Sequence, residues 1–199
     1  FIMDIERLDF IDAVKFLGNK FNINIEFEHS SKSSKDLFNQ LYSIHEMAKN
    51  YYKENINDEI IELLNERNIN KESITTFDIG LSLNKYDGLL SSIRPHNFSS
   101  ESLKKSGLFI DNDKGYIDRF RNRIIFPIYN HLNKIVGFAG RIYKGDSKIA
   151  KYLNSPETPI YSKSKILYGM HLNKNNILEN QSVVIVEGYL DLIQLYQAN

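Results

Sequence analysis

Apolar residues recur at helical spacing along most of the first 76 residues. The pattern predicts one amphipathic helix within residues 1–28 that gives way to a short extended tail. Three further helices are predicted over residues 36–54, 58–68 and 70–76. The segment 29–35 is polar and low in sequence complexity, a composition typical of a linker.

A β-hairpin is predicted farther along the chain. Residues 123–129 and 134–143 are rich in β-branched and aromatic side chains, and the polar residues 130–133 between them suit a turn. Before the hairpin, residues 99–107 predict a short helix. Residues 144–177 show neither a helical nor a strand period, so an irregular segment is predicted there.

A third pattern, near the C-terminus, predicts a strand, a tight turn and a helix. The apolar run at residues 182–186 predicts a buried strand, and Gly188 allows a sharp turn after it. Glu187 then stands at the carboxyl end of the strand, where side chains of α/β units face a crevice. Asp191 follows one helical turn later.

Two carboxylates at such a position suit a hard cation, because Mg²⁺ takes oxygen ligands and is usually shared with substrate phosphates. A solvated strand end at Glu187 and a favourable charge at a helix N-terminus from Asp191 explain the same residues without a metal.

The charge of the chain is zero in total but unevenly distributed. Residues 1–93 hold 10 Lys and Arg against 16 Asp and Glu, whereas residues 94–177 hold 15 against 6. Residues 178–199 hold none against 3. A basic block next to a pair of carboxylates suits a phosphate-bearing partner, and a basic solvated surface is the alternative.

Three arginines alternate in the basic block, at Arg119, Arg121 and Arg123. On an extended chain they would share one face and offer planar donors to phosphates. The alternative is that they pair with nearby carboxylates, those of Asp111, Asp113 and Asp118. Residues 151–169 add lysines interleaved with tyrosines, which suit phosphate contact and base stacking.

Composition excludes several classes of protein. The chain has no cysteine, so it forms no disulfide and offers no thiolate to zinc. Its five histidines show no metal-ligand spacing and are interpreted as surface or core residues. No apolar run is long enough to span a bilayer, and no signal-peptide pattern is present, so no membrane partner is expected.

Several stretches together resemble one known family. They are Asp-Arg-Phe-Arg-Asn-Arg-Ile-Ile-Phe-Pro-Ile at 118–128, Val-Gly-Phe-Ala-Gly-Arg at 136–141, Lys-Tyr-Leu-Asn-Ser-Pro-Glu-Thr at 151–158, Leu-Tyr-Gly at 167–169 and Val-Glu-Gly-Tyr-Leu-Asp at 186–191. In this order and spacing they resemble the catalytic core of bacterial DnaG-type DNA primases. The opening segment is similar to the one that follows the zinc-binding domain in that family.

The resemblance implies an α+β fold, in which a helical and β-hairpin subdomain leads into the first strand–helix unit of a Toprim domain. Residues 1–28 would be the tail of the zinc-binding domain and 29–35 a linker. Residues 36–177 would form the basic subdomain of the catalytic core, and residues 178–199 would begin a truncated Toprim domain.

The resemblance also implies template-directed synthesis of short RNA primers from ribonucleoside triphosphates on single-stranded DNA, in the cytoplasm at the replication fork. Glu187 would be a catalytic metal ligand with Asp191 beside it, binding Mg²⁺ or, in its place, Mn²⁺. Lys151 would be catalytic. Contacts to nucleotide or template are implied for Arg119, Arg121, Arg141, Lys151, Tyr152, Asn154 and Lys163.

Some family features lie outside these residues. Zinc ligands would precede Phe1, and an Asp-x-Asp metal cluster and a domain for the replicative helicase would follow Asn199. Glu187 and Asp191 are too few ligands for a two-metal centre, so the fragment alone is expected to be inactive. A phage-type primase-helicase and a non-catalytic single-stranded-DNA-binding Toprim relative are the alternatives.

Overall fold

The computed structural model of the protein describes residues 1–6, 8–23, 32–113, 115–144 and 150–198. The chain forms two compact units, Phe1–Asp36 and Leu37–Asn199. Within the described ranges, no helix combines the length and the apolar character needed to cross a bilayer.

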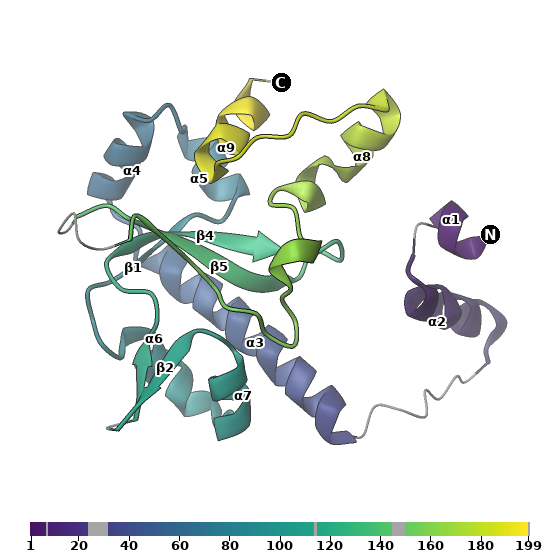
Figure 1. Ribbon diagram of the computed structural model, residues 1–199, viewed down its shortest axis with the longest axis horizontal. Helices are drawn as coiled ribbons and strands as arrows, with labels where there is room; N and C mark the ends of the chain where they lie inside the picture. Colours follow the sequence, from purple (N-terminus) through teal and green to yellow (C-terminus); the bar gives the residue numbers. More distant parts are fainter. Residues whose placement is uncertain (7, 24–31, 114, 145–149, 199) are drawn as a thin grey trace. The chain divides into compact units, whose positions relative to one another are not determined.

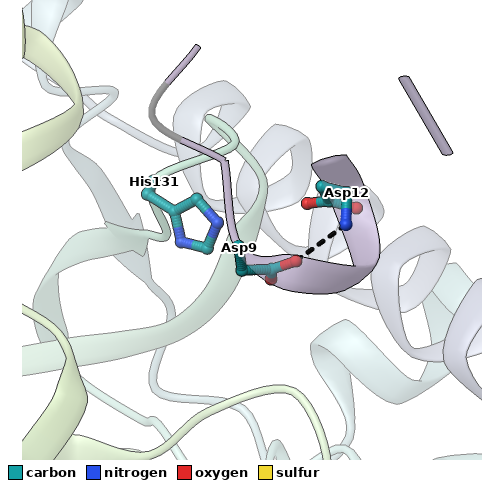
Figure 2. A group of neighbouring side chains, drawn as sticks. All are labelled: Asp9, Asp12 and His131. Atoms are coloured by element: carbon teal, nitrogen blue, oxygen red, sulfur yellow. Dashed lines mark hydrogen bonds between the residues drawn. The ribbon is translucent and has the colours of Figure 1, made fainter. Parts of the chain in front are cut away.

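The first unit contains two helices, α1 (Ile2–Glu6) and α2 (Phe10–Phe21), where a single helix was predicted. Asp9 separates them, because its side chain accepts a hydrogen bond of 2.8 Å from the backbone N–H of Asp12 and so caps α2 (Figure 2). An N-cap residue has an extended backbone, which a continuous helix cannot contain. The prediction of one helix is therefore wrong. The extended tail predicted after it falls mostly on residues 24–31, outside the described part.

Helix α3 (Lys32–Glu54) begins at Lys32 rather than at residue 36, so residues 32–35 of the predicted linker are helical. The next two predicted helices are confirmed as α4 (Asp58–Asn65) and α5 (Lys71–Thr76). Asn57 and Asn70 cap them by accepting a hydrogen bond from the backbone N–H of the third residue of each helix.

The middle of the chain is a series of short elements. They are β1 (Gly80–Ser82), α6 (Gly88–Ile93), the 3₁₀ helix η1 (Arg94–His96), α7 (Ser100–Lys105), β2 (Phe109–Asn112) and β3 (Gly115–Asp118). The predicted helix near residue 100 is confirmed as α7. Strands β2 and β3 form a two-stranded antiparallel hairpin of their own.

The main sheet is antiparallel, with the order β1-β4-β5-β6. The predicted hairpin is confirmed as β4 (Arg123–Tyr129) and β5 (Ile135–Ile142), while the edge strand β6 (Tyr152–Asn154) lies in the segment predicted to be irregular. Three residues are too few for a periodic pattern, so only pairing with β5 defines β6.

Helices cover both faces of this sheet (Figure 1). On one face, Ile125 and Phe138 pack against the α3 residue Tyr52. On the other face, Ile124 and Phe126 pack against α4, α5 and the C-terminal helix α9 (Tyr189–Gln197). Strands β4 and β5 are therefore buried on both sides. A polar side chain in either strand is unusual at such a position and indicates a structural or functional role.

The C-terminal stretch differs from its prediction in two respects. Helix α8 (Met170–Asn180) was not predicted, since its asparagine-rich sequence has low helix propensity. The prediction of a buried strand at 182–186 is wrong here: Val183, Val184 and Ile185 are 58%, 75% and 75% exposed. A strand requires a neighbour for its backbone hydrogen bonds, and no described strand lies beside this run. The helix predicted after Gly188 is confirmed as α9.

Candidate nucleotide and nucleic-acid site

Arg141 is the central polar residue on the α9-covered face of the sheet. It lies opposite Tyr152 in the β5–β6 pair, and its guanidinium carbon is 5.9 Å from the centre of the Tyr152 ring. Its side chain is 6% exposed, and its Nε is buried without a hydrogen-bond partner among the described residues. Burial lowers the pKa of Arg141, so a bound anion would stabilise its charged form.

Tyr189 joins the beginning of α9 to the same place. Its hydroxyl donates a hydrogen bond of 3.2 Å to Oδ1 of Asn154, and its ring lies 6.1 Å from that of Tyr152. Burial raises the pKa of Tyr189 to about 12, so the hydroxyl keeps its proton at neutral pH. Arg141, Tyr152, Asn154 and Tyr189 form one group, which we call the Arg141 cluster.

Glu187 is exposed on the turn that leads into Tyr189, and Asp191 is exposed in the first turn of α9. Asp191 folds back over this turn, because a Cβ atom on Gly188 would stand 2.6 Å from Asp191 Oδ2. The contact of Tyr189 with Asn154 keeps the turn beside β6. Both carboxylates are exposed and lie within two residues of Tyr189 along the chain.

Arg67 supplies a second positive charge that the sequence did not single out. It is exposed in the connection between α4 and α5, and its charge helps to lower the pKa of Arg141. Gln194 of α9 holds this connection by donating to the Arg67 carbonyl at 2.7 Å. Arg67 lies in the acidic half of the chain, so no sequence signal links it to the site.

Lys151 is exposed immediately before Tyr152, and a buried arginine fixes its backbone. Nη1 of Arg123 donates to the carbonyls of Gly140, Ala150 and Lys151 at 3.1, 3.1 and 3.3 Å. Arg123 therefore acts as a structural clamp between β4, β5 and the segment before β6.

The prediction that Arg119, Arg121 and Arg123 form one row is wrong. The chain bends after β3, and Asn122 takes a left-handed backbone conformation with φ of 55°, so the alternation of an extended strand is lost. Each side chain then has a different environment, and the described ion pairs do not include one between these arginines and a neighbouring aspartate.

Arg121 lies on an exposed aromatic ring. Its guanidinium carbon is 5.2 Å from the centre of the Tyr86 ring, and Tyr86 is 71% exposed. Arg121 also donates to the Asp118 carbonyl. Arg119 is half-buried and its Nε has no described partner. Tyr86 is a second residue that the sequence analysis missed, although its place between Lys85 and Asp87 in a short turn was a weak signal.

Lys163 lies farther along, in the 3₁₀ helix η2 (Lys163–Lys165). Its side chain is exposed, and its backbone N–H donates to Glu157 Oε1 at 2.8 Å. The structure thus groups Arg141, Tyr152 and Asn154 and places Lys151 next to them. Arg119 and Arg121 lie in the connection between β3 and β4, and Lys163 lies in η2.

The sequence matches the family model described as the N-terminal domain of the DNA primase catalytic core over residues 47–174. The chain belongs to the DNA primase family. The DNA primase of Clostridium acetobutylicum is 37% identical over 203 residues, which cover 99% of this chain and 33% of that protein. The chain thus spans about one third of the length of the curated primases it matches.

Solved primase structures share the fold. The RNA polymerase domain of the Mycobacterium tuberculosis primase DnaG, in complex with a double-stranded DNA oligomer with a 6-nucleotide overhang, has a TM-score of 0.75 at 30% identity and covers 80% of this chain and 51% of that one. A DnaG primase catalytic domain bound to ssDNA has a TM-score of 0.72 at 31% identity, covering 81% and 53%. The Aquifex aeolicus primase, solved with zinc binding and RNA polymerase domains, has 0.73 at 25% identity, covering 98% and 47%. The α+β fold expected from the primase resemblance is confirmed.

Proposed function

We propose that this chain is part of a DNA primase that synthesises short RNA primers on single-stranded DNA from ribonucleoside triphosphates, in the cytoplasm at replication forks. Membership of the primase family supports the proposal, as do the similar primase domains solved with DNA. The observation that carries it is Arg141, a buried arginine whose Nε has no described partner and whose guanidinium lies near the Tyr152 ring.

The Arg141 cluster suits a nucleotide or a template phosphate. Arg141 and Arg67 would neutralise a phosphate, because a guanidinium presents several planar donors. The Tyr152 ring would stack on a base, which is sequence-tolerant since every base has a π face. Tyr189 donates to the Asn154 amide oxygen, so the amide N–H groups of Asn154 point away from that contact and would act as donors to a ligand.

Lys151, Lys163, Arg119 and Arg121 would extend the basic surface along the template or the triphosphate. Lys151 is the best placed for a catalytic role, since Arg123 fixes its backbone and Tyr152 of the Arg141 cluster follows it directly. Arg121 over the exposed Tyr86 ring forms a further platform on which a base of a single strand would stack.

Glu187 and Asp191 would hold Mg²⁺, with Mn²⁺ as a substitute, since both are exposed carboxylates on either side of Gly188, at the start of α9. Bound there, the ion would stabilise the negative charge that develops on the attacking 3′ oxygen and on the leaving pyrophosphate. Residues from 178 onward would begin a Toprim domain. A pair of carboxylates is fewer than a two-metal centre needs, so we expect these 199 residues alone to make no primer.

The substitution Glu187→Gln in the full-length protein tests the assignment. We expect loss of primer synthesis by at least about 100-fold, since the amide offers a neutral and weaker ligand to the ion. Affinity for single-stranded DNA should change less than about two-fold, because Glu187 contributes no positive charge to the template. Primer synthesis is measured with labelled ribonucleotides and affinity by fluorescence anisotropy.

Glu179→Gln is the matched control, because Glu179 is also exposed but lies on α8. It should leave both measurements unchanged. Synthesis near the wild-type rate in Glu187→Gln would contradict the metal assignment. A wild-type protein that binds the oligonucleotide but makes no RNA would instead favour a non-catalytic single-stranded-DNA-binding relative.

A further inference from the structure

The two halves of the segment 151–158 have different surroundings. Lys151, Tyr152 and Asn154 in the first half lie at the Arg141 cluster, whereas the second half is held by the rest of the fold. Ser155 is buried at 5% exposure; its N–H donates to the Phe138 carbonyl at 2.8 Å, and its Oγ accepts from the Phe138 N–H at 2.9 Å. Ser155 thus fastens the segment to β5 immediately after Asn154.

The turn after Ser155 is fixed from two further directions. A Cβ on Gly107 would stand 2.9 Å from Cγ of Pro156 and 3.0 Å from Cγ2 of Thr158, so both residues pack closely against the Gly107 backbone. Thr158 and Tyr161 exchange backbone hydrogen bonds of 3.0 and 3.2 Å. Glu157 is exposed, but it projects from a turn whose neighbouring residues are held in place.

The Glu157 carboxylate accepts a hydrogen bond of 2.8 Å from the backbone N–H of Lys163. An ionised acceptor makes this bond stronger than one between neutral groups. No ion pair is found between the Glu157 carboxylate and the Lys163 ammonium in the described part of the chain. Glu157 therefore fixes the backbone from which Lys163 projects and leaves the lysine charge for another partner.

We propose that Glu157 is a positioning residue that places Lys163 for contact with the triphosphate of an incoming nucleotide. The inference rests on the proposed function of the basic surface and adds a residue to it. The Ser155–Thr158 turn is held against β5, and Glu157 projects from this turn. Its hydrogen bond to the backbone of Lys163 therefore fixes the first residue of η2 relative to β5. The substrate would contact Lys163 and not Glu157, whose own charge would repel a triphosphate.

Kinetics of the full-length protein test this relation through a double-mutant cycle. Lys163→Ala should raise KM for ribonucleoside triphosphates by about ten-fold, because it removes one charged contact to phosphate. Glu157→Ala should raise KM by a similar factor with kcat nearly unchanged. In Glu157→Gln the amide oxygen still accepts from the Lys163 N–H, so KM should return to within about two-fold of wild type. The double variant should be no worse than Lys163→Ala alone, because Glu157 acts only through Lys163.

Hydrogen–deuterium exchange of the full-length protein provides a readout that is independent of activity. The peptide that contains the Lys163 amide should exchange faster in Glu157→Ala than in wild type or Glu157→Gln, while peptides of β5 should be unaffected. Glu179→Ala serves as the exposed control and should change neither measurement.

The outcomes separate the inference from the proposed function. A raised KM in Lys163→Ala together with a normal KM in Glu157→Ala, or with additive effects in the double variant, overturns the positioning role and leaves the proposed function intact. A normal KM in Lys163→Ala overturns the nucleotide role of Lys163 and the positioning role with it.

Discussion

At the scale of single residues, the surroundings of a side chain determine its pKa and its protonation state. His45 of α3 is fully buried and stacks on Phe138, with ring centres 5.7 Å apart. Its Nδ1 lies 2.8 Å from the Leu41 carbonyl, which assigns the proton to Nδ1, while Nε2 has no described partner. Burial lowers the pKa of His45 to about 4, so the imidazole is neutral in the folded state.

His45 should make the folded state sensitive to acid. Between pH 6.5 and about 4 the unfolded chain binds a proton that the folded chain does not, so the free energy of unfolding falls as the pH falls through this window. The effect is roughly 3 kcal/mol at most. Urea unfolding followed by circular dichroism at pH 7 and pH 5 should show a smaller loss in His45→Leu.

Asp118 has the opposite effect to His45 on the pH dependence of the free energy of unfolding. Its carboxylate accepts from the N–H groups of Leu89 and Leu90 at 2.8 and 3.1 Å, but burial raises its pKa to about 6. Between pH 3.8 and about 6 the folded chain keeps a proton on Asp118 that the unfolded chain has lost. The contribution of Asp118 to the free energy of unfolding therefore falls as the pH rises through this window. Asp118→Asn should make the loss of stability in acid steeper. An unchanged pH profile in both variants would contradict these environments.

At the scale of elements, helix α3 and the sheet approach each other through a glycine. A Cβ atom on Gly80 of β1 would stand 2.5 Å from the backbone carbonyl carbon of Tyr52. The helix backbone cannot move away easily, because Ile44, Ala48 and Tyr52 of α3 are buried against the same face of the sheet. Gly80 thus sets the spacing between α3 and β1.

Gly80→Ala should lower the free energy of unfolding by about 2–3 kcal/mol, the cost of forcing a methyl group into a packed core. Gly88→Ala is the matched control, because its methyl group would first meet the hydroxyl end of the Tyr51 side chain, which can rotate. We expect a loss below about 1 kcal/mol there. Chemical denaturation measures the free energy of unfolding of both variants. Equal losses would contradict the view that the close approach of α3 and β1 requires a glycine at position 80.

At the scale of the whole molecule, the basic residues are divided between structure and proposed binding. Arg123 binds three carbonyls, and Lys144 and Lys105 form ion pairs with Glu59 and Glu101. Arg67, Arg141 and Lys151 lie at or beside the Arg141 cluster. The charge count alone therefore overstates the surface available to phosphates.

The division predicts which lysines and arginines contribute to salt-dependent binding. For single strands, the slope of log K against log salt falls by about 0.7 for each phosphate contact that is lost. Arg67→Ala should reduce the slope by about this amount, whereas Lys105→Ala, whose ammonium is paired with Glu101, should not change it. Anisotropy titrations of the full-length protein between 50 and 200 mM salt test this. A slope unchanged in Arg67→Ala would remove Arg67 from the proposed site.

The sequence by itself determined the helices α4, α5 and α9, the β4–β5 hairpin and the family, because local periodicity and contiguous motifs encode them. The break at Asp9 is also local, because the side chain that caps α2 acts within three residues. Tertiary structure alone decided strand β6, the separation of the three arginines and the position of Arg67 beside Arg141. These features depend on which distant segments pair or pack, and a side chain's partners across the fold leave no period in its own sequence. The same reason explains the exposed run at 182–186: its composition favours a strand, but a strand exists only with a neighbour.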